Sequence, residues 1–289
     1  MARVSLGIMT PPAQVGYDEI LRVWQEADGI PVIEHAWLFD HLIPIFGDPD
    51  GPVLEGWTTL AALAASTTRL RMGLLVSANR VRPPALLARM AATVDVISGG
   101  RLDFGIGVGS RPDAPIARRE YAAHGLPFVP VAEAVAAFTE AVPAIRRLWT
   151  EEQPFDLDGK YVQLKDAYCN PKPVQRPGPP IVIGGRSAPV LRVVAEHADI
   201  WNMPGGSMQD ADDRSALLDR YCERIGRNPA EITRSLPIGV SYDRPDTTRA
   251  AIAEAIEHGF THLVLSLPSP YPPEVAAWVA TELAPAAGL

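Results

Sequence analysis

Cysteines, cationic residues and long apolar runs are all scarce in this 289-residue sequence. Its two cysteines, Cys169 and Cys222, allow at most one bridge and have no metal-ligand spacing, which excludes a disulfide framework. The 26 Lys and Arg against 34 Asp and Glu give a net charge of -8, which disfavours nucleic acid as a partner. No apolar run approaches the roughly 20 residues of a membrane span, and no signal-peptide pattern is present. We therefore expect a cytoplasmic protein with no membrane partner.

Several catalytic and nucleotide-binding motifs are also missing. Gly105, Gly107 and Gly109 lack the G-x-G-x-x-G spacing of a dinucleotide site, and no P-loop lysine occurs. There is no G-x-S-x-G elbow, no paired-cysteine motif and no third metal ligand at useful spacing from Asp40 and His41. The sequence thus supports neither a hydrolase nor a metal site.

Short apolar strands alternate with amphipathic helices along the whole chain. The hydrophobic content of 47% suffices for one large core, so we expect a single domain over 1–289. Strands are predicted at 4–9, 35–39, 70–77, 102–108, 180–183, 198–203, 236–242 and 262–267. Helices are predicted at 17–27, 57–66, 85–97, 131–149, 190–197, 210–225, 249–258 and 273–283. Eight such repeats predict an α/β fold, the (β/α)8 TIM barrel.

An insertion interrupts this alternation at 152–180, between the fourth helix and the fifth strand of the repeat. Asp158-Gly159 lies between alternating apolar residues there and indicates a β-hairpin, and a proline-rich extended run follows. We expect the insertion to cover one mouth of the barrel.

Residues 98–111, SGGRLDFGIGVGSR, hold the most distinctive pattern. Gly99-Gly100 fits the left-handed end of a helix, and an apolar strand follows with glycine at positions 105, 107 and 109. Glycine has no side chain to pack in a strand, so this run indicates that another molecule lies against the backbone. The alternative is a tight barrel interior that tolerates no side chains. The stretch alone does not decide between the two.

Polar residues follow two other strands, at the end of a barrel where enzymes place working groups. Asp40-His41 can hold a proton, orient a ring or bind a cofactor edge near neutral pH. Gly184-Gly185-Arg186-Ser187 precedes a helix, whose free N–H groups bind phosphate, and Arg186 can add a charge-assisted contact. The alternatives are a capping Asp with a solvated His, and a glycine pair that merely turns the chain.

A set of motifs runs through most of the chain: Trp37-Leu38-Phe39-Asp40-His41, the blocks at 54–64 and 82–109, the run at 171–177, Ile183-Gly184-Gly185 and Ala198-Asp199-Ile200-Trp201-Asn202. With these motifs the sequence resembles the luciferase-like monooxygenase superfamily, and more narrowly its coenzyme F420-dependent oxidoreductases. The motifs stand in family order and are specific as a set.

The resemblance implies a flavin or deazaflavin at the carboxyl-end mouth of the barrel, with a set of contacts to the cofactor. Asp40 and His41 would lie near the ring, with His41 as proton donor or acceptor and Asp40 positioning the cofactor. The region around Gly73 and Leu74 would carry a bulge, often a non-prolyl cis peptide, that backs the ring. The implied bulge residues are Gly73, Leu74, Leu75 and Val76, and the implied tail- and phosphate-binding residues are Gly107, Val108, Gly109, Ser110, Gly184, Gly185 and Arg186.

The activity implied by the resemblance is hydride transfer between coenzyme F420 and a small organic substrate. One alternative is an FMN-dependent monooxygenase that takes reduced flavin from a partner reductase and consumes oxygen. A non-catalytic flavin-binding protein is another, because Ser110-Arg111 stands where many relatives carry an acid assigned as proton donor. The family commonly dimerises, so the resemblance also implies a homodimer.

Overall fold

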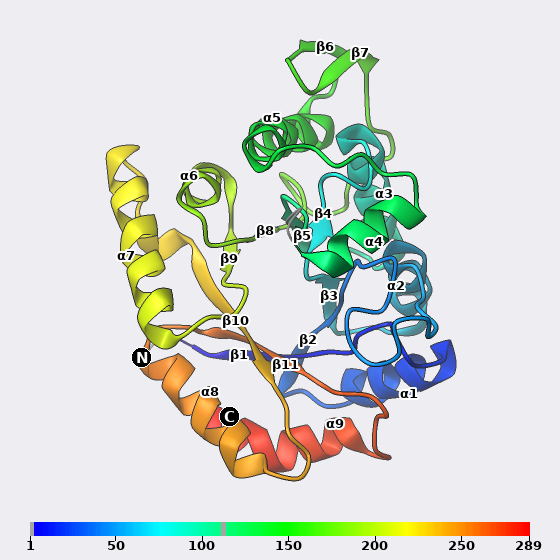
Figure 1. Ribbon diagram of the computed structural model, residues 1–289, viewed down its shortest axis with the longest axis vertical. Coiled ribbons are helices and arrows are strands. Elements are labelled where there is room, and N and C mark those ends of the chain that lie inside the picture. Colours follow the sequence, from blue (N-terminus) through cyan, green and yellow to red (C-terminus); the bar gives the residue numbers. More distant parts are fainter. Residues whose placement is uncertain (1–2, 111–113) are drawn as a thin grey trace.

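The computed structural model describes residues 3–110 and 114–289, and it shows the predicted barrel (Figure 1). All strand pairs of the main sheet are parallel, in the order β3-β2-β1-β11-β10-β9-β8-β5-β4. The strands are β1 (Ser5–Met9), β2 (Ile33–Leu38), β3 (Arg71–Leu74), β4 (Ser77–Ala78), β5 (Phe104–Gly107), β8 (Ile181–Gly184), β9 (Ile200–Asn202), β10 (Thr233–Gly239) and β11 (His262–Ser266).

The barrel closes between β3 and β5. Met72 pairs in parallel with Leu102, and the Asp103 N–H donates to the Met72 carbonyl at 2.7 Å. Nearer the carboxyl end of the barrel, β4 replaces β3 as the neighbour of β5, and Ser77 pairs with Ile106. The single strand predicted over 70–77 is therefore two short strands, separated by a cis peptide bond between Leu75 and Val76.

Helices surround the barrel, and both ends of the chain lie on the same side of the molecule (Figure 1). No helix within 3–110 and 114–289 is long and apolar enough to cross a membrane. The helices are α1 (Tyr17–Asp28), α2 (Gly56–Ser66), α3 (Pro84–Ile97), α4 (Pro115–Ala123), α5 (Val131–Thr150), α6 (Ala188–His197), α7 (Met208–Arg224), α8 (Pro245–Glu257) and α9 (Val275–Trp278).

Local sequence signals explain several helix ends. Glu55 accepts the N–H groups of Trp57 and Thr58 and so caps the start of α2. Gly99 and Gly100 have φ of 65° and 87°, the left-handed region that glycine adopts without strain. The predicted glycine stop after α3 is confirmed.

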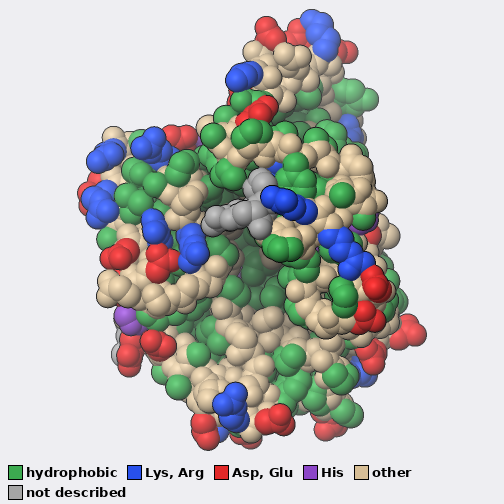
Figure 2. Space-filling model, viewed as in Figure 1, with side chains coloured by type: hydrophobic (Ala, Val, Ile, Leu, Met, Phe, Trp, Pro, Cys, Tyr) green, Lys and Arg blue, Asp and Glu red, His purple; other side chains and the backbone are tan. Residues whose placement is uncertain are grey.

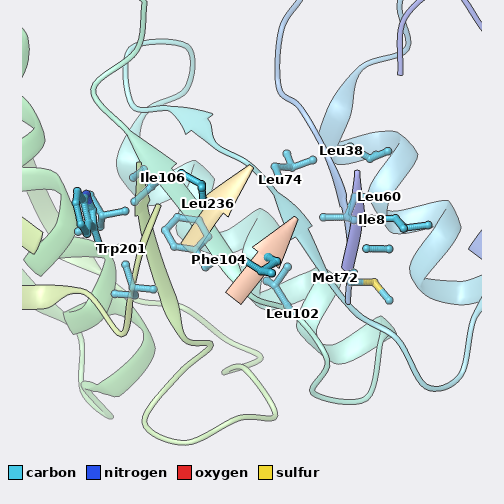
Figure 3. Close-up of a cluster of buried hydrophobic side chains, with 14 of the residues drawn as sticks. Ile8, Leu38, Leu60, Met72, Leu74, Leu102, Phe104, Ile106, Trp201 and Leu236 are labelled. Carbon is cyan, nitrogen blue, oxygen red and sulfur yellow. The ribbon is translucent and has the colours of Figure 1, made fainter. Parts of the chain in front are cut away.

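Two apolar clusters hold the barrel. The larger lies between strands and helices, where Leu38, Leu60 and Met72 pack together with their neighbours (Figure 3). The smaller fills the barrel interior around Trp37 and Val264. The side chains at positions 36–38 of β2 alternate between the two clusters because successive strand residues point to opposite faces.

The insertion forms the predicted hairpin, β6 (Phe155–Asp158) paired antiparallel with β7 (Gln163–Ala167). It stands on α5 at the far end of the molecule (Figure 1), where the Glu140 carboxylate accepts the N–H groups of Tyr161 at 2.7 Å and Val162 at 3.0 Å. The proline run then reaches the amino-terminal end of the barrel, where the Gln175 amide donates to the Leu102 carbonyl at 2.7 Å.

Candidate active site

A cavity of about 820 Å³ opens at the carboxyl ends of β2, β4, β5, β8 and β9. This volume lies within the ~300–1,000 Å³ of small-molecule sites. The face seen in Figure 2 is hollowed near its centre and carries several Lys and Arg side chains on its left rim. Within the described part of the chain, no residue before Asp40 or after Arg214 lines the cavity.

The same boundary shows which end of the barrel the insertion reaches. No described residue of 152–180 lines this cavity, because the hairpin stands on the outer side of α5 and the proline run reaches the opposite end of the barrel. The insertion, expected to cover one mouth of the barrel, therefore reaches the amino-terminal end and lies away from the carboxyl-end cavity.

His41 lines the cavity and is paired with a carboxylate from α4. Its Nδ1 lies 3.1 Å and 3.2 Å from the two carboxylate oxygens of Glu120. The Leu42 N–H donates to the same carboxylate at 2.6 Å and fixes its position. The Glu120 side chain is buried, whereas about 30% of the His41 side chain is exposed. An imidazole held through Nδ1 by an anion keeps its Nε2 available for proton transfer.

Asp40 lies deeper than His41 and is held by an arginine that sequence reasoning missed. Two bonds of 2.6 Å and 2.9 Å join the Arg82 guanidinium to the Asp40 carboxylate, whose side chain has no exposed surface. Arg82 also pairs with Glu55. Burial raises the pKa of Asp40 above its ordinary value, while Arg82 and a hydrogen bond from Ser77 oppose the rise. This network ties the strand end of β2 to β4 and α2.

Glycines at the strand ends make room first for the chain itself. A Cβ on Gly105 would lie 1.8 Å from the Leu74 carbonyl oxygen, and one on Gly107 or Gly184 would lie 2.9 Å from Val76 Cγ2. The bulge between β3 and β4 therefore packs against these bare positions. Gly105 fits the tight-interior alternative, whereas Gly107 and Gly184 also line the cavity.

Gly73 and Leu74 lie away from the cavity, unlike the other predicted bulge residues. A Cβ on Gly73 would lie 2.5 Å from the Trp37 ring, so this glycine accommodates the barrel core. Leu74 is buried in the cluster between strands and helices. Leu75 and Val76, which the cis peptide bond joins, do line the cavity.

One end of the cavity is rich in cationic groups. Arg186, just before α6, and Arg214 of α7 both pair with Asp210, each at 3.0 Å. Two guanidinium groups thus share one carboxylate, which leaves excess positive charge beside the first turn of α6. Ser187, the N-cap residue of α6, and Ala188, its first residue, also line the cavity. N–H groups in a first helical turn have no partner within the helix, so this end suits an anion.

Most of the predicted site residues meet at this one cavity. The lining includes Asp40, His41, Leu75, Val76, Gly107, Val108, Gly109, Ser110, Gly184, Gly185 and Arg186. Arg111, named with the missing acid, lies outside the described residues. Among the described residues no group of three or more His, Cys, Asp or Glu could hold a metal ion.

Sequence reasoning missed Glu120, Asn202 and Arg80, which also line the cavity. Glu120 supplies an acid close to His41 from α4, ten residues after Ser110. Asn202 ends a block quoted for the family resemblance, and that was the available signal for it.

Residues 4–284 match the family model described as luciferase-like monooxygenase. The chain belongs to this family of enzymes. Its luciferase-like relatives include pyrimidine monooxygenase RutA of Allorhizobium ampelinum, 30% identical over 210 residues, which cover 71% of this chain and 54% of that protein. F420-dependent glucose-6-phosphate dehydrogenase of Kineococcus radiotolerans is 29% identical over 214 residues, 73% of this chain and 60% of that protein.

The first curated relatives that match are uncharacterised, and the matched region spans 59% of their length. Among solved structures, an F420-dependent secondary alcohol dehydrogenase in complex with an F420-acetone adduct has a TM-score of 0.87 at 17% identity, covering 99% of both chains. At that identity the likeness shows the luciferase-like barrel fold.

Proposed function

We propose that this luciferase-like enzyme transfers hydride between the deazaflavin coenzyme F420 and a small organic substrate. The observation that carries the proposal is the pairing of His41 with buried Glu120 in a cavity whose other end is cationic. Relatives named as F420-dependent dehydrogenases support the choice of cofactor.

The residues present fit a planar ring with a phosphorylated tail. Arg186, Arg214 and the first turn of α6 provide the groups that would hold a phosphate, and Leu75 and Val76 present a backbone surface that would back the ring. When bound, a deazaflavin supplies a carbon that accepts or donates hydride.

His41 would hold or release the substrate proton at Nε2. The Glu120 carboxylate accepts a hydrogen bond from the Nδ1–H group of His41 and so selects the tautomer. The role proposed for Asp40 is to position the cofactor through its network with Arg82 and Ser77, since its carboxylate is fully covered.

The first test measures binding of each purified cofactor by fluorescence quenching. A second assay measures turnover with a panel of alcohols and sugar phosphates. We expect tight binding of coenzyme F420. His41→Ala is expected to lower kcat by about 100-fold or more, and Glu120→Gln is expected to lower kcat and alter the pH profile. Glu231→Gln, in the short helix after α7, is the matched control. Tight binding of FMN with none of coenzyme F420 would refute the cofactor choice.

A second candidate is an FMN-dependent monooxygenase that receives reduced flavin from a partner reductase. The family description and the pyrimidine monooxygenase relative favour it. It predicts oxygen uptake with chemically reduced FMN and a substrate, measured at an oxygen electrode. Absence of uptake across the substrate panel would count against it.

We also propose that the protein is a cytoplasmic homodimer. Both cysteines are buried free thiols, which suits a reducing compartment. Sedimentation equilibrium measures the mass, and a monomer at micromolar concentration would contradict the dimer. Fractionation of the source cells checks the location.

A further inference from the structure

Below the cavity, a chain of polar side chains crosses the barrel interior. Asn202 of β9 donates through Nδ2 to Ser235 Oγ at 3.1 Å, and Ser235 Oγ lies 2.8 Å from Nδ1 of His262. The His262 ring stacks on that of His35, with centroids 3.9 Å apart and planes 9° apart. Trp37 Nε1 bonds His35 Nδ1 at 2.7 Å. The proposed reaction uses none of these groups, and all five are buried.

Hydrogen-bond chemistry fixes the direction of this chain. Ser235 Oγ accepts from the Asn202 amide, and among the described residues His262 Nδ1 is the only other group in hydrogen-bond contact with it, so its buried hydroxyl proton is given to His262 Nδ1. Nδ1 is then an acceptor, so His262 is neutral with its proton on Nε2. Burial lowers the pKa of His262 to about 4, which agrees with a neutral ring.

The stacked partner is neutral by an independent argument. An indole N–H only donates, so Trp37 makes Nδ1 of His35 an acceptor. Burial holds the pKa of His35 well below its ordinary value. A neutral ring against His262 avoids the repulsion that two imidazolium rings would suffer at this distance.

The direction of these hydrogen bonds decides whether Asn202 presents a hydrogen-bond donor or an acceptor to the cavity. Asn202 ends β9 opposite Gly184, and both residues line the cavity. With one amide N–H committed to Ser235, the carboxamide oxygen remains as an acceptor. The opposite arrangement, in which Ser235 donates to that oxygen, would need a proton on His262 Nδ1.

We propose that Asn202 contacts the ligand and that Ser235 and His262 orient it, so that its carboxamide oxygen accepts from a ligand imide N–H or hydroxyl. The ligand identity rests on the proposed function, because flavin and deazaflavin rings both carry an imide N–H and alcohol substrates carry a hydroxyl. The orientation of Asn202 does not rest on it.

The orientation is tested without ligand by long-range ¹H–¹⁵N spectra of the full chain labelled at histidine. We expect the imidazoles of His35 and His262 both to show a bare Nδ1 and a protonated Nε2 at neutral pH. The signals of His262 should move in Ser235→Ala and stay in place in Ser266→Ala. Ser266 is the matched control because it lies on β11 and does not line the cavity. A protonated Nδ1 on His262 would overturn the proposal.

The ligand contact is tested by dissociation constants for coenzyme F420, FMN and FMN methylated at the imide nitrogen. Wild type is expected to prefer FMN over the methylated form by roughly three- to tenfold, the worth of one neutral hydrogen bond. Asn202→Leu should abolish this preference, and Ser235→Ala should weaken it. Asn202→Asp, which keeps an oxygen acceptor, should retain it in part.

The two possible sources of the donor give different results. If the preference is absent in wild type but Asn202→Leu raises KM for an alcohol roughly three- to tenfold, the donor is the substrate hydroxyl. The ligand contact is refuted if Asn202→Leu keeps the wild-type preference for FMN over methylated FMN. It is also refuted if Asn202→Leu changes neither that preference nor the KM for the alcohol. Failure of both parent cofactors to bind wild type would refute the proposed function, while the histidine spectra would still decide the orientation.

Discussion

Replacement of Arg82 by Met is expected to destabilise the protein in a pH-dependent way. The Arg82 guanidinium makes two hydrogen bonds to a carboxylate with no exposed surface, and only the Ser77 hydroxyl would remain to oppose its burial. Removal of one partner from such a buried pair costs about 3–5 kcal/mol. We expect a loss of this size in the free energy of unfolding at pH 7, measured by urea denaturation.

The sign of the pH dependence follows from the pKa of Asp40. Burial already raises it in the folded wild type, so this group favours folding most when protonated, and that contribution is lost as pH rises through the folded pKa. Without Arg82 the folded pKa rises further. The gap between wild type and Arg82→Met should therefore be largest at neutral pH and shrink in acid.

Two controls make this prediction refutable. Asp40→Asn combined with Arg82→Met removes the uncompensated charge, so it should recover a large part of the stability lost in Arg82→Met. Arg147→Met changes a half-exposed arginine of α5 and should cost less than about 1 kcal/mol. A loss in Arg82→Met below 1 kcal/mol, or one equal at pH 5 and pH 7, would contradict the reasoning.

Two further predictions concern the packing of the barrel and its hairpin. Gly105→Ala should lower the free energy of unfolding by about 3 kcal/mol or more, because its Cβ would meet the Leu74 carbonyl at 1.8 Å, whereas Gly16→Ala, with open space around it, serves as the mild control in urea denaturation. Glu140→Gln should speed hydrogen exchange of the β6–β7 turn without changing cofactor affinity; equal exchange rates in the two proteins would refute this role of Glu140. Desolvation acts to raise the pKa of Glu140, but the backbone N–H donors of the turn outweigh it and hold this pKa below its ordinary value. The stabilisation of the turn by Glu140 should therefore be present above its unfolded pKa and fade as pH falls through its folded pKa.

The barrel could be predicted from the sequence because each strand and helix carries its own periodic signal. The break between β3 and β4 could be predicted only in part: the family resemblance implies a bulge around Gly73 and Leu74, but the apolar run at 74–76 does not show where the strand breaks. The bulge depends on bare positions elsewhere in the chain, at Gly105, Gly107 and Gly184, whose common neighbour only the fold reveals.

Sequence reasoning recovered the cavity residues at strand ends but not their partners. Asp40 and His41 follow a strand, which suffices to place them at the mouth. Their partners, Arg82 and Glu120, are 42 and 79 residues away along the chain. Pairings at such separations are set by how α4 and β4 dock, and no local pattern encodes that docking.

Because the described residues that line the cavity come from one side of the barrel, one half of the barrel contributes to the site and the other half does not. Within the described residues, β10, β11, β1 and the helices α8, α9 and α1 give the cavity no lining side chain. Apart from Ser235 and His262, that half can be reinforced by better packing with little risk to ligand binding, whereas changes at the lining residues alter stability and binding together. An engineer seeking a more stable catalyst would therefore begin with the packing of α1, α8 and α9.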